Sequence, residues 1–374
     1  RSFDCGGADI EHPATRVRQH TARVRYRRRV AESEVDVPVL QPAQLTRRMI
    51  IGFGLAAPTL AVPWLAGCSS SDPGVDAPIS TPPPSNPPAS ATASPSPTAV
   101  ESHPSAGAAA PEQALAALAA AILGGQRRQQ LSKDRRTLLA FVRNAHTAHA
   151  GAIANPLPSQ APVKLGGQSV SSSLAFLARR ESAAAGRYRS VALKSTGQDA
   201  LLWGSFSVAS GGFAAAIALA NPPSVRPVAA PKPVEVLSEV AAVQEMVRQL
   251  HAMVYGYQLA IGKLKMLSKT RPRAERELLT TRVFRDRLIA SLRKRSAEVP
   301  AAEPAYVPSV VPRNAAAAGK LIMKMHTALQ PFCGLWLAAA ESQAERMQAL
   351  SALSSEVKIA RSWGAPLGAW PGWS

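Results

Sequence analysis

Apolar residues between positions 236 and 264 recur in alternating steps of four and three, and this spacing constrains the fold more than any other feature. Such a repeat puts one side chain per turn on a single helix face, the seam along which the helices of a bundle pack. The positions are Val236, Val240, Val243, Val247, Leu250, Val254, Tyr257, Ile261 and Leu264. The spacing therefore predicts a long packed helix rather than a strand.

Similar spacing returns elsewhere and predicts an all-α fold of two up-down helical bundles. In residues 235–374 it marks three more helices, with a proline-rich loop (300–312) long enough to cross the end of a bundle. In residues 111–220, four helices are expected from about 111, 131, 169 and 198. Prolines in residues 221–234 stop the last of these and mark a linker between the bundles.

An export signal precedes both bundles. Arg47 and Arg48 stand ahead of an uncharged apolar run that ends in Leu65-Ala66-Gly67-Cys68. Paired arginines, an apolar run and small residues before a cysteine, in this order, resemble a twin-arginine signal peptide that ends in a lipobox. We expect residues 46–67 to be removed, Cys68 to be acylated, and the protein to be held on the outer face of the cell membrane.

The apolar run has two other interpretations. A buried core helix is disfavoured, because Pro58 and Pro63 would interrupt it. A retained single membrane span fits the length of the run, and it predicts the same orientation because the basic flank stays inside.

The segments beside the signal lack the apolar periodicity of a packed core. Residues 1–45 carry a basic cluster, and we expect a disordered extension; a nucleic-acid-binding arm is disfavoured because cleavage would discard it. Residues 68–110 are rich in Pro, Ser and Thr, which predicts an extended tether between the anchor and the fold.

Charge and cysteine content narrow the partners and the chemistry. The formal charge is +19, and it stays near +15 without the ten arginines and six acids that precede Cys68. This excess favours anionic partners, and an exported protein meets lipid head groups or envelope polymers rather than nucleic acid. Once Cys5 is removed and Cys68 acylated, Cys333 is left without a disulfide partner, and we expect a buried free thiol.

The second bundle resembles a known family. The segment Leu250-His251-Ala252-Met253-Val254-Tyr255-Gly256-Tyr257 resembles the Glu-His-Ala-Ala-Val-Tyr-x-Tyr helix of a ferritin-like family of unassigned function, which occurs in exported proteins of high-GC Gram-positive bacteria. Later landmarks match at Arg282–Asp286, Tyr306–Pro308, Arg361–Trp363 and Pro371-Gly372. The resemblance covers about residues 236–373 and implies a ferritin-like bundle with no assigned activity. Leu250 departs from it, since the family usually has an acid there.

Candidate metal ligands occur in the first bundle. Di-iron bundles use inward carboxylates and Glu-x-x-His pairs, and the second bundle has no such pair; His251 and His326 follow seam residues and are predicted at the surface or boundary. Glu181, however, falls on the seam of its own helix, and His146 and His149 share one face of the preceding helix. These three residues predict either a metal site or a hydrogen-bonded polar cluster that fixes helix register, and they fall short of the six ligands of a di-iron site.

Basic residues are dense between Lys263 and Arg295. A solvated helical face explains most of them, and a surface for anionic lipid or an envelope polymer is the alternative.

No catalytic fingerprint stands in a supporting context: neither a Ser-His-Asp or Cys-His arrangement, nor a phosphate loop, nor a dinucleotide motif. The sequence therefore favours a non-enzymatic lipoprotein, a binding or scaffolding module at the cell envelope. The alternative is a ferritin-type metal-dependent oxidoreductase or metal store, for which a metal ion is the one cofactor expected.

Overall fold

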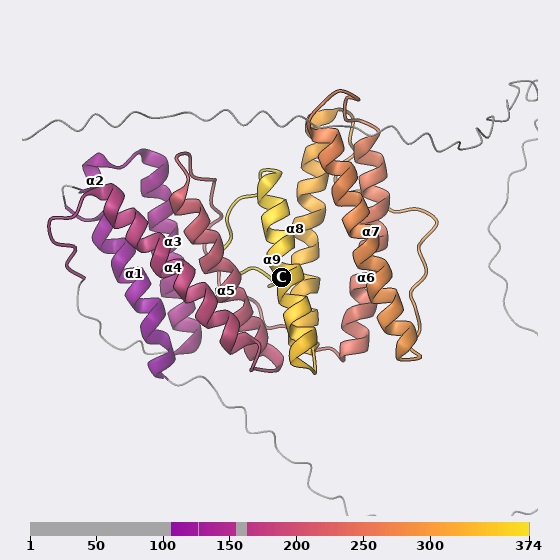
Figure 1. Cartoon of the computed structure of the whole chain (residues 1–374), viewed down its shortest axis with the longest axis horizontal. Helices are drawn as coiled ribbons and strands as arrows, with labels where there is room; N and C mark the ends of the chain where they lie inside the picture. The colour runs from indigo at the N-terminus through magenta and orange to yellow at the C-terminus, as the bar shows by residue number, and fades with distance from the viewer. Residues whose placement is uncertain (1–105, 126, 155–162, 374) are drawn as a thin grey trace, which may run out of the picture. The chain divides into compact units, whose positions relative to one another are not determined.

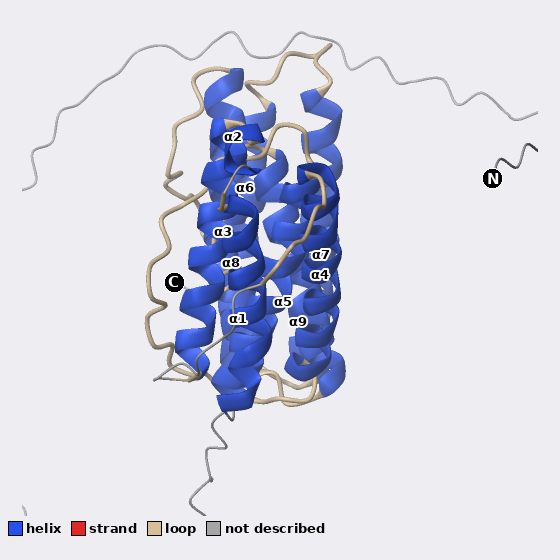
Figure 2. Cartoon of the chain, turned by 90° about the vertical axis from the view of Figure 1, so that its left-hand side faces the viewer, coloured by secondary structure: helices blue, strands red, loops and turns tan. Residues whose placement is uncertain are grey.

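The computed structural model describes residues 106–125, 127–154 and 163–373, which form the all-α fold that the sequence predicted (Figure 1). Within these ranges the extended pairing is limited to one isolated bridge, between Val225 and Leu367, and no strand is drawn in Figure 2. The predicted extension (1–45), the export signal with Arg47 and Arg48, the acylation site Cys68 and the tether up to residue 105 lie outside the described residues.

The first bundle has four long helices. A short α2 (Arg127–Gln130) and a 3-10 turn (Ala106–Ala109) accompany α1 (Ala110–Leu123), α3 (Lys133–Ile153), α4 (Val170–Ala192) and α5 (Gly197–Ala218). Helix α3 runs antiparallel to α5, because Phe141 contacts Phe213 while His149 contacts Phe206. Since α4 and α5 form an antiparallel pair, α3 and α4 point the same way, and the end of α3 and the start of α4 lie at opposite ends of the bundle.

The second bundle repeats this path. It contains α6 (Glu239–Ile261), α7 (Thr270–Lys294), α8 (Ala315–Ala339) and α9 (Gln343–Ser362). Helices α6 and α8 are antiparallel, because Gly256 lies against Met325 while the backbone of Glu341 donates to Glu239. The long connection 295–314 therefore joins two helices, α7 and α8, that run in the same direction. Helix α6 begins three residues later than the seam, so Val236 precedes it and is exposed.

Side-chain caps explain where most of these helices begin. Ser132, Ser169, Ser238, Asn314 and Ser342 each precede a helix and accept a hydrogen bond from the backbone N–H three residues on. Each cap satisfies a donor that the helix cannot satisfy internally and contributes about 1 kcal/mol.

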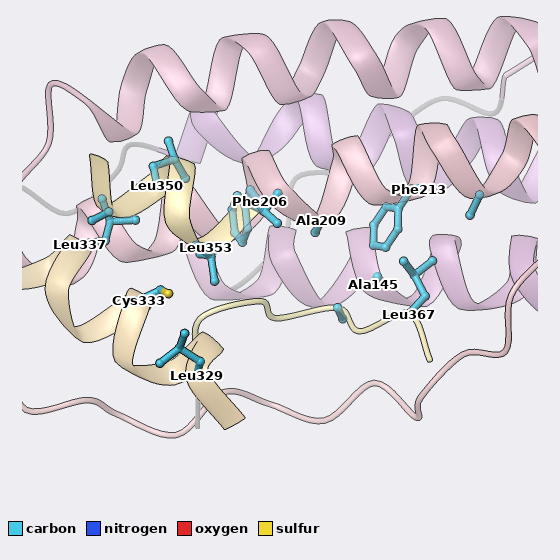
Figure 3. Close-up of a cluster of buried hydrophobic side chains, with 14 of the residues drawn as sticks. Ala145, Phe206, Ala209, Phe213, Leu329, Cys333, Leu337, Leu350, Leu353 and Leu367 are labelled. Carbon is cyan, nitrogen blue, oxygen red and sulfur yellow. The ribbon is translucent and has the colours of Figure 1, made fainter. Parts of the chain in front are cut away.

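Helix α5 joins the two bundles. It is long and apolar enough to cross a membrane, but it is mostly buried, since it contacts α4 in its own bundle and α8 and α9 in the other. Small residues allow the close approach, and Gly204 lies against Leu337 and Leu350. Figure 3 shows the shared core, which includes the free thiol of Cys333; its burial was predicted and raises its pKa.

The C-terminal tail (363–373) returns from α9 toward the first bundle. Leu367 exchanges backbone hydrogen bonds with Ser224 and Arg226, the two residues that flank Val225. Gly372 passes so close to α8 that a Cβ atom on Gly334 would collide with its carbonyl group. Gly334 is thus required where the tail crosses the helix.

We predict that Gly334→Ala destabilises the protein by about 1–3 kcal/mol, because the new methyl group meets backbone that cannot move without displacing the tail. Thermal unfolding of the full-length chain measures this. The matched control is Gly186→Ala in α4, where a Cβ has open space and helix propensity should raise stability by about 0.5–1 kcal/mol. Equal effects of the two substitutions would contradict the prediction.

Candidate metal centre

Four ionisable side chains meet in the core of the first bundle. Glu112 comes from the first turn of α1, His146 and His149 from one face of α3, and Glu181 from the middle of α4, and all four are completely buried. The two histidines share a face because residues three apart in a helix are neighbours. Aromatic rings surround them: Phe206 stacks on His149 at 4.2 Å between ring centroids, and Phe213 meets His146 edge-on at 5.4 Å.

The histidine rings converge on one carboxylate oxygen. Oε2 of Glu112 lies 2.6 Å from Nδ1 of His146 and 3.0 Å from Nδ1 of His149. The other nitrogen of each ring also faces an oxygen: Nε2 of His146 lies 2.7 Å from Oε1 of Glu181, and Nε2 of His149 lies 2.8 Å from the carbonyl oxygen of Ala369. All four ring nitrogens therefore face acceptors, and a hydrogen bond at each requires a proton on each.

Opposite charges compensate one another in this core. Burial by itself would lower the pKa of His146, but Glu181 and Glu112 outweigh it and raise that pKa to about 10. Burial would raise the pKa of Glu112, but the two histidines hold it well below its usual value. Burial and then the charge of Glu112 raise the pKa of Tyr188, which stays a neutral phenol.

The donor set suits a divalent transition-metal ion. Glu112, His146 and His149 each offer a ligand atom, and these atoms lie within 4.8 Å of one another. Two imidazoles and one carboxylate are a common ligand set for such ions. Oε2 of Glu181 is buried without a hydrogen-bond partner among the described residues, and the hydroxyl of Tyr188 lies close enough to Glu112 to feel its charge, so further polar atoms lie around the centre.

Glu181 has a different place from the one expected. The sequence predicted that His146, His149 and Glu181 form either a metal site or a hydrogen-bonded polar cluster, and the structure does bring the three together. Glu181, however, binds the Nε2 side of His146, away from the point where the two Nδ1 atoms converge. It occupies the position of a carboxylate that orients a histidine ligand from behind.

Sequence reasoning missed Glu112. An acid in the first turn of a helix is ordinary, because it interacts favourably with the helix dipole, and Glu112 stands there in α1. A second signal was available: Glu112 lies three residues before Leu115 and six before Leu118, on the apolar face of α1. An acid at a seam position marks a buried carboxylate, as it did for Glu181.

The C-terminal tail closes the centre. Besides the Ala369 carbonyl, the ring of Trp370 contacts His149 edge-on at 4.6 Å between centroids. No periodic pattern in the sequence links these residues to α3, so only the folded chain reveals the contact.

The second bundle contains a smaller polar chain. His326 is buried, so its prediction as a surface or boundary residue was wrong; His251 is partly exposed. His326 binds Glu356 through Nδ1 and the Tyr257 hydroxyl through Nε2, and that hydroxyl donates to Glu277 at 3.2 Å. Both nitrogens of His326 are thus used, and in the described part of this bundle no group of three ligand atoms converges.

We predict that stability falls as the pH rises from about 6.5 to about 10. The pKa of His146 is raised from 6.5 to about 10. Its contribution to the free energy of unfolding is therefore fully present below pH 6.5 and is lost as the pH rises through 10, a loss of a few kcal/mol. The contribution of Glu112, whose pKa is lowered, is present above 4.5 and is lost as the pH falls. Urea unfolding at several pH values measures the slope, and His146→Gln should flatten it between 6.5 and 10. An equal slope in both proteins would contradict the assignment.

Comparison with known proteins identifies the second bundle only. A family model described as a domain of unknown function, DUF4439, matches residues 242–374, from near the start of α6 to the end of the chain. Searches of curated proteins and of solved structures returned no match. The C-terminal region thus carries a domain of unknown function, and the candidate metal centre lies in the first bundle, outside the matched residues.

Proposed function

We propose that this protein is a non-enzymatic envelope lipoprotein that binds one divalent transition-metal ion in its first bundle, through Glu112, His146 and His149. One observation carries the proposal. Both histidines point Nδ1 at the same carboxylate oxygen while Nε2 of each faces a second acceptor, a carboxylate for one and a backbone carbonyl for the other. Histidines that bind metals almost always donate their other N–H to such a partner.

Charge balance supports the same conclusion. With a proton on each ring nitrogen, two imidazolium rings balance two carboxylates. Bound at the convergence point, a divalent ion would supply the two positive charges of the Nδ1 protons, and the buried cluster would keep its net charge. The net charge of the buried cluster would therefore be zero both with the two Nδ1 protons and with the ion in their place.

The path of the chain supports a ferritin-type origin for both bundles. Each has a long connection between two helices that run in the same direction, as ferritin-like bundles do. Ferritin-type di-iron sites take a Glu from each of two helices and a Glu-x-x-His from each of the other two. The first bundle has the two glutamates and one His-x-x-His on α3, but α5 places Phe206 and Phe213 against the histidine rings. The three ligands that converge, Glu112, His146 and His149, are half of the six ligands of a di-iron site, and this favours one ion over two and a binding role over oxygen chemistry.

The predicted export signal supports a location for this function outside the cell. Arg47, Arg48 and the lipobox at Cys68 support anchoring on the outer face of the membrane, where a folded metal-binding domain would meet extracellular ions. The apolar α5 is not required as an anchor, because it forms the core shared by the two bundles.

We predict that the purified full-length chain, stripped with a chelator, takes up about one equivalent of Zn²⁺, Fe²⁺ or Mn²⁺ in a calorimetric titration. Glu112→Gln should abolish tight binding, because a neutral amide replaces the carboxylate that supplies the shared ligand oxygen and its negative charge. Glu181→Gln keeps the ligands and should weaken binding about 10–100-fold, because it removes only the carboxylate behind His146.

The matched control is His326→Gln, which removes a buried histidine paired with a glutamate in the other bundle. It should bind metal like the unmodified chain, and circular dichroism should show that all three variants are folded. Failure of the unmodified chain to retain any ion, or equal losses in His326→Gln and Glu181→Gln, would refute the centre.

A further inference from the structure

The loop between α6 and α7 exposes two large apolar side chains at its tip. The side chain of Leu267 is fully exposed, with a relative exposure of 101%, and that of Met266 is 73% exposed. Neither lies on a helix face that the bundle covers, since they fall between the end of α6 at Ile261 and the start of α7 at Thr270. Their exposure to water is unfavourable and calls for a partner.

The loop is held in one shape rather than left free. Leu264 is buried and anchors it, and Nη1 of Arg271 donates to the carbonyl oxygen of Leu264 at 3.3 Å. The hydroxyl of Ser268 donates to the carbonyl of Lys265 at 2.8 Å and accepts from the backbone N–H of Arg271. A fixed loop of this kind presents Met266 and Leu267 outward without an entropic cost on binding.

Charge of a single sign surrounds the apolar tip. Lys263, Lys265 and Lys269 are exposed, and none of them is paired with an acid in the part of the chain that the structure describes. No acidic residue occurs between positions 262 and 274. On α7, by contrast, several basic residues are already paired, as Arg273 is with Glu277 and Arg285 with Asp286. Three unpaired positive charges, with no acid among them, therefore flank the apolar tip of the loop.

We propose that the α6–α7 loop inserts Met266 and Leu267 into the surface of a lipid bilayer that contains anionic lipids, with the three lysines among the head groups. A bilayer offers both complements at once, an apolar interior beneath a negatively charged surface. A stable protein interface needs a broader surface than two side chains provide, which favours the bilayer over a protein partner. This inference does not depend on the metal centre, which lies in the other bundle.

The test is partitioning of the full-length chain onto vesicles, with Cys68→Ala in every protein so that no acyl chain contributes. On vesicles with about one third anionic lipid, Met266→Gln with Leu267→Gln should lower the partition coefficient at least about tenfold. Lys263→Gln, Lys265→Gln and Lys269→Gln together should lower it roughly a hundredfold on anionic vesicles and leave it unchanged on neutral ones.

Matched controls distinguish membrane binding by the loop from non-specific binding by any exposed apolar or basic residue. Leu219→Gln with Met347→Gln changes two exposed apolar residues elsewhere, and Lys133→Gln, Lys194→Gln and Lys320→Gln remove the same charge from exposed sites elsewhere. These controls should partition like the parent. The apolar run of the export signal is common to all proteins and cancels in the comparison. The proposal is overturned if the loop variants have the partition coefficient of the parent, in which case a protein partner would explain the exposed loop. It is also overturned if the controls lower the partition coefficient as much as the loop variants do.

Discussion

A chain of carboxylates and imidazoles inside a hydrocarbon core is the constraint on which the first bundle depends. Each of these groups would be costly to bury alone, and each is tolerated because a partner of opposite charge lies within hydrogen-bond distance. The partners come from α1, α3 and α4, so these helices must pack in one register. Removing one member would leave a buried charge uncompensated, a loss of about 3–5 kcal/mol.

The two bundles are alike in path but differ in what their cores offer. In the first, the Nδ1 atoms of His146 and His149 both face Oε2 of Glu112, which lies between them. In the second, both nitrogens of His326 are used by Glu356 and Tyr257, and the chain ends on Glu277, which also binds Arg273 and Trp363. The first core thus holds three ligand atoms close enough together for one ion, whereas the second is a closed hydrogen-bond network that fixes helix positions.

Contact between the bundles brings the Ala369 carbonyl to the candidate metal centre. Small residues on α5 bring it close to α8 and α9, and the tail that follows α9 can then reach α3. The Ala369 carbonyl at His149 comes from the domain of unknown function, although the centre lies outside it. The two bundles thus contribute to one site. The tail that links them can cross α8 closely only because residue 334 is a glycine.

The sequence by itself determined the helices, because apolar spacing, proline positions and serine or asparagine caps act over a few residues. It also singled out His146, His149 and Glu181, since an acid on an apolar seam is anomalous wherever the helix packs. Only the tertiary structure decided which atoms converge. Glu112, Ala369 and His326 acquire their roles through contacts across tens to hundreds of residues, and no local pattern encodes which ring nitrogen faces which oxygen.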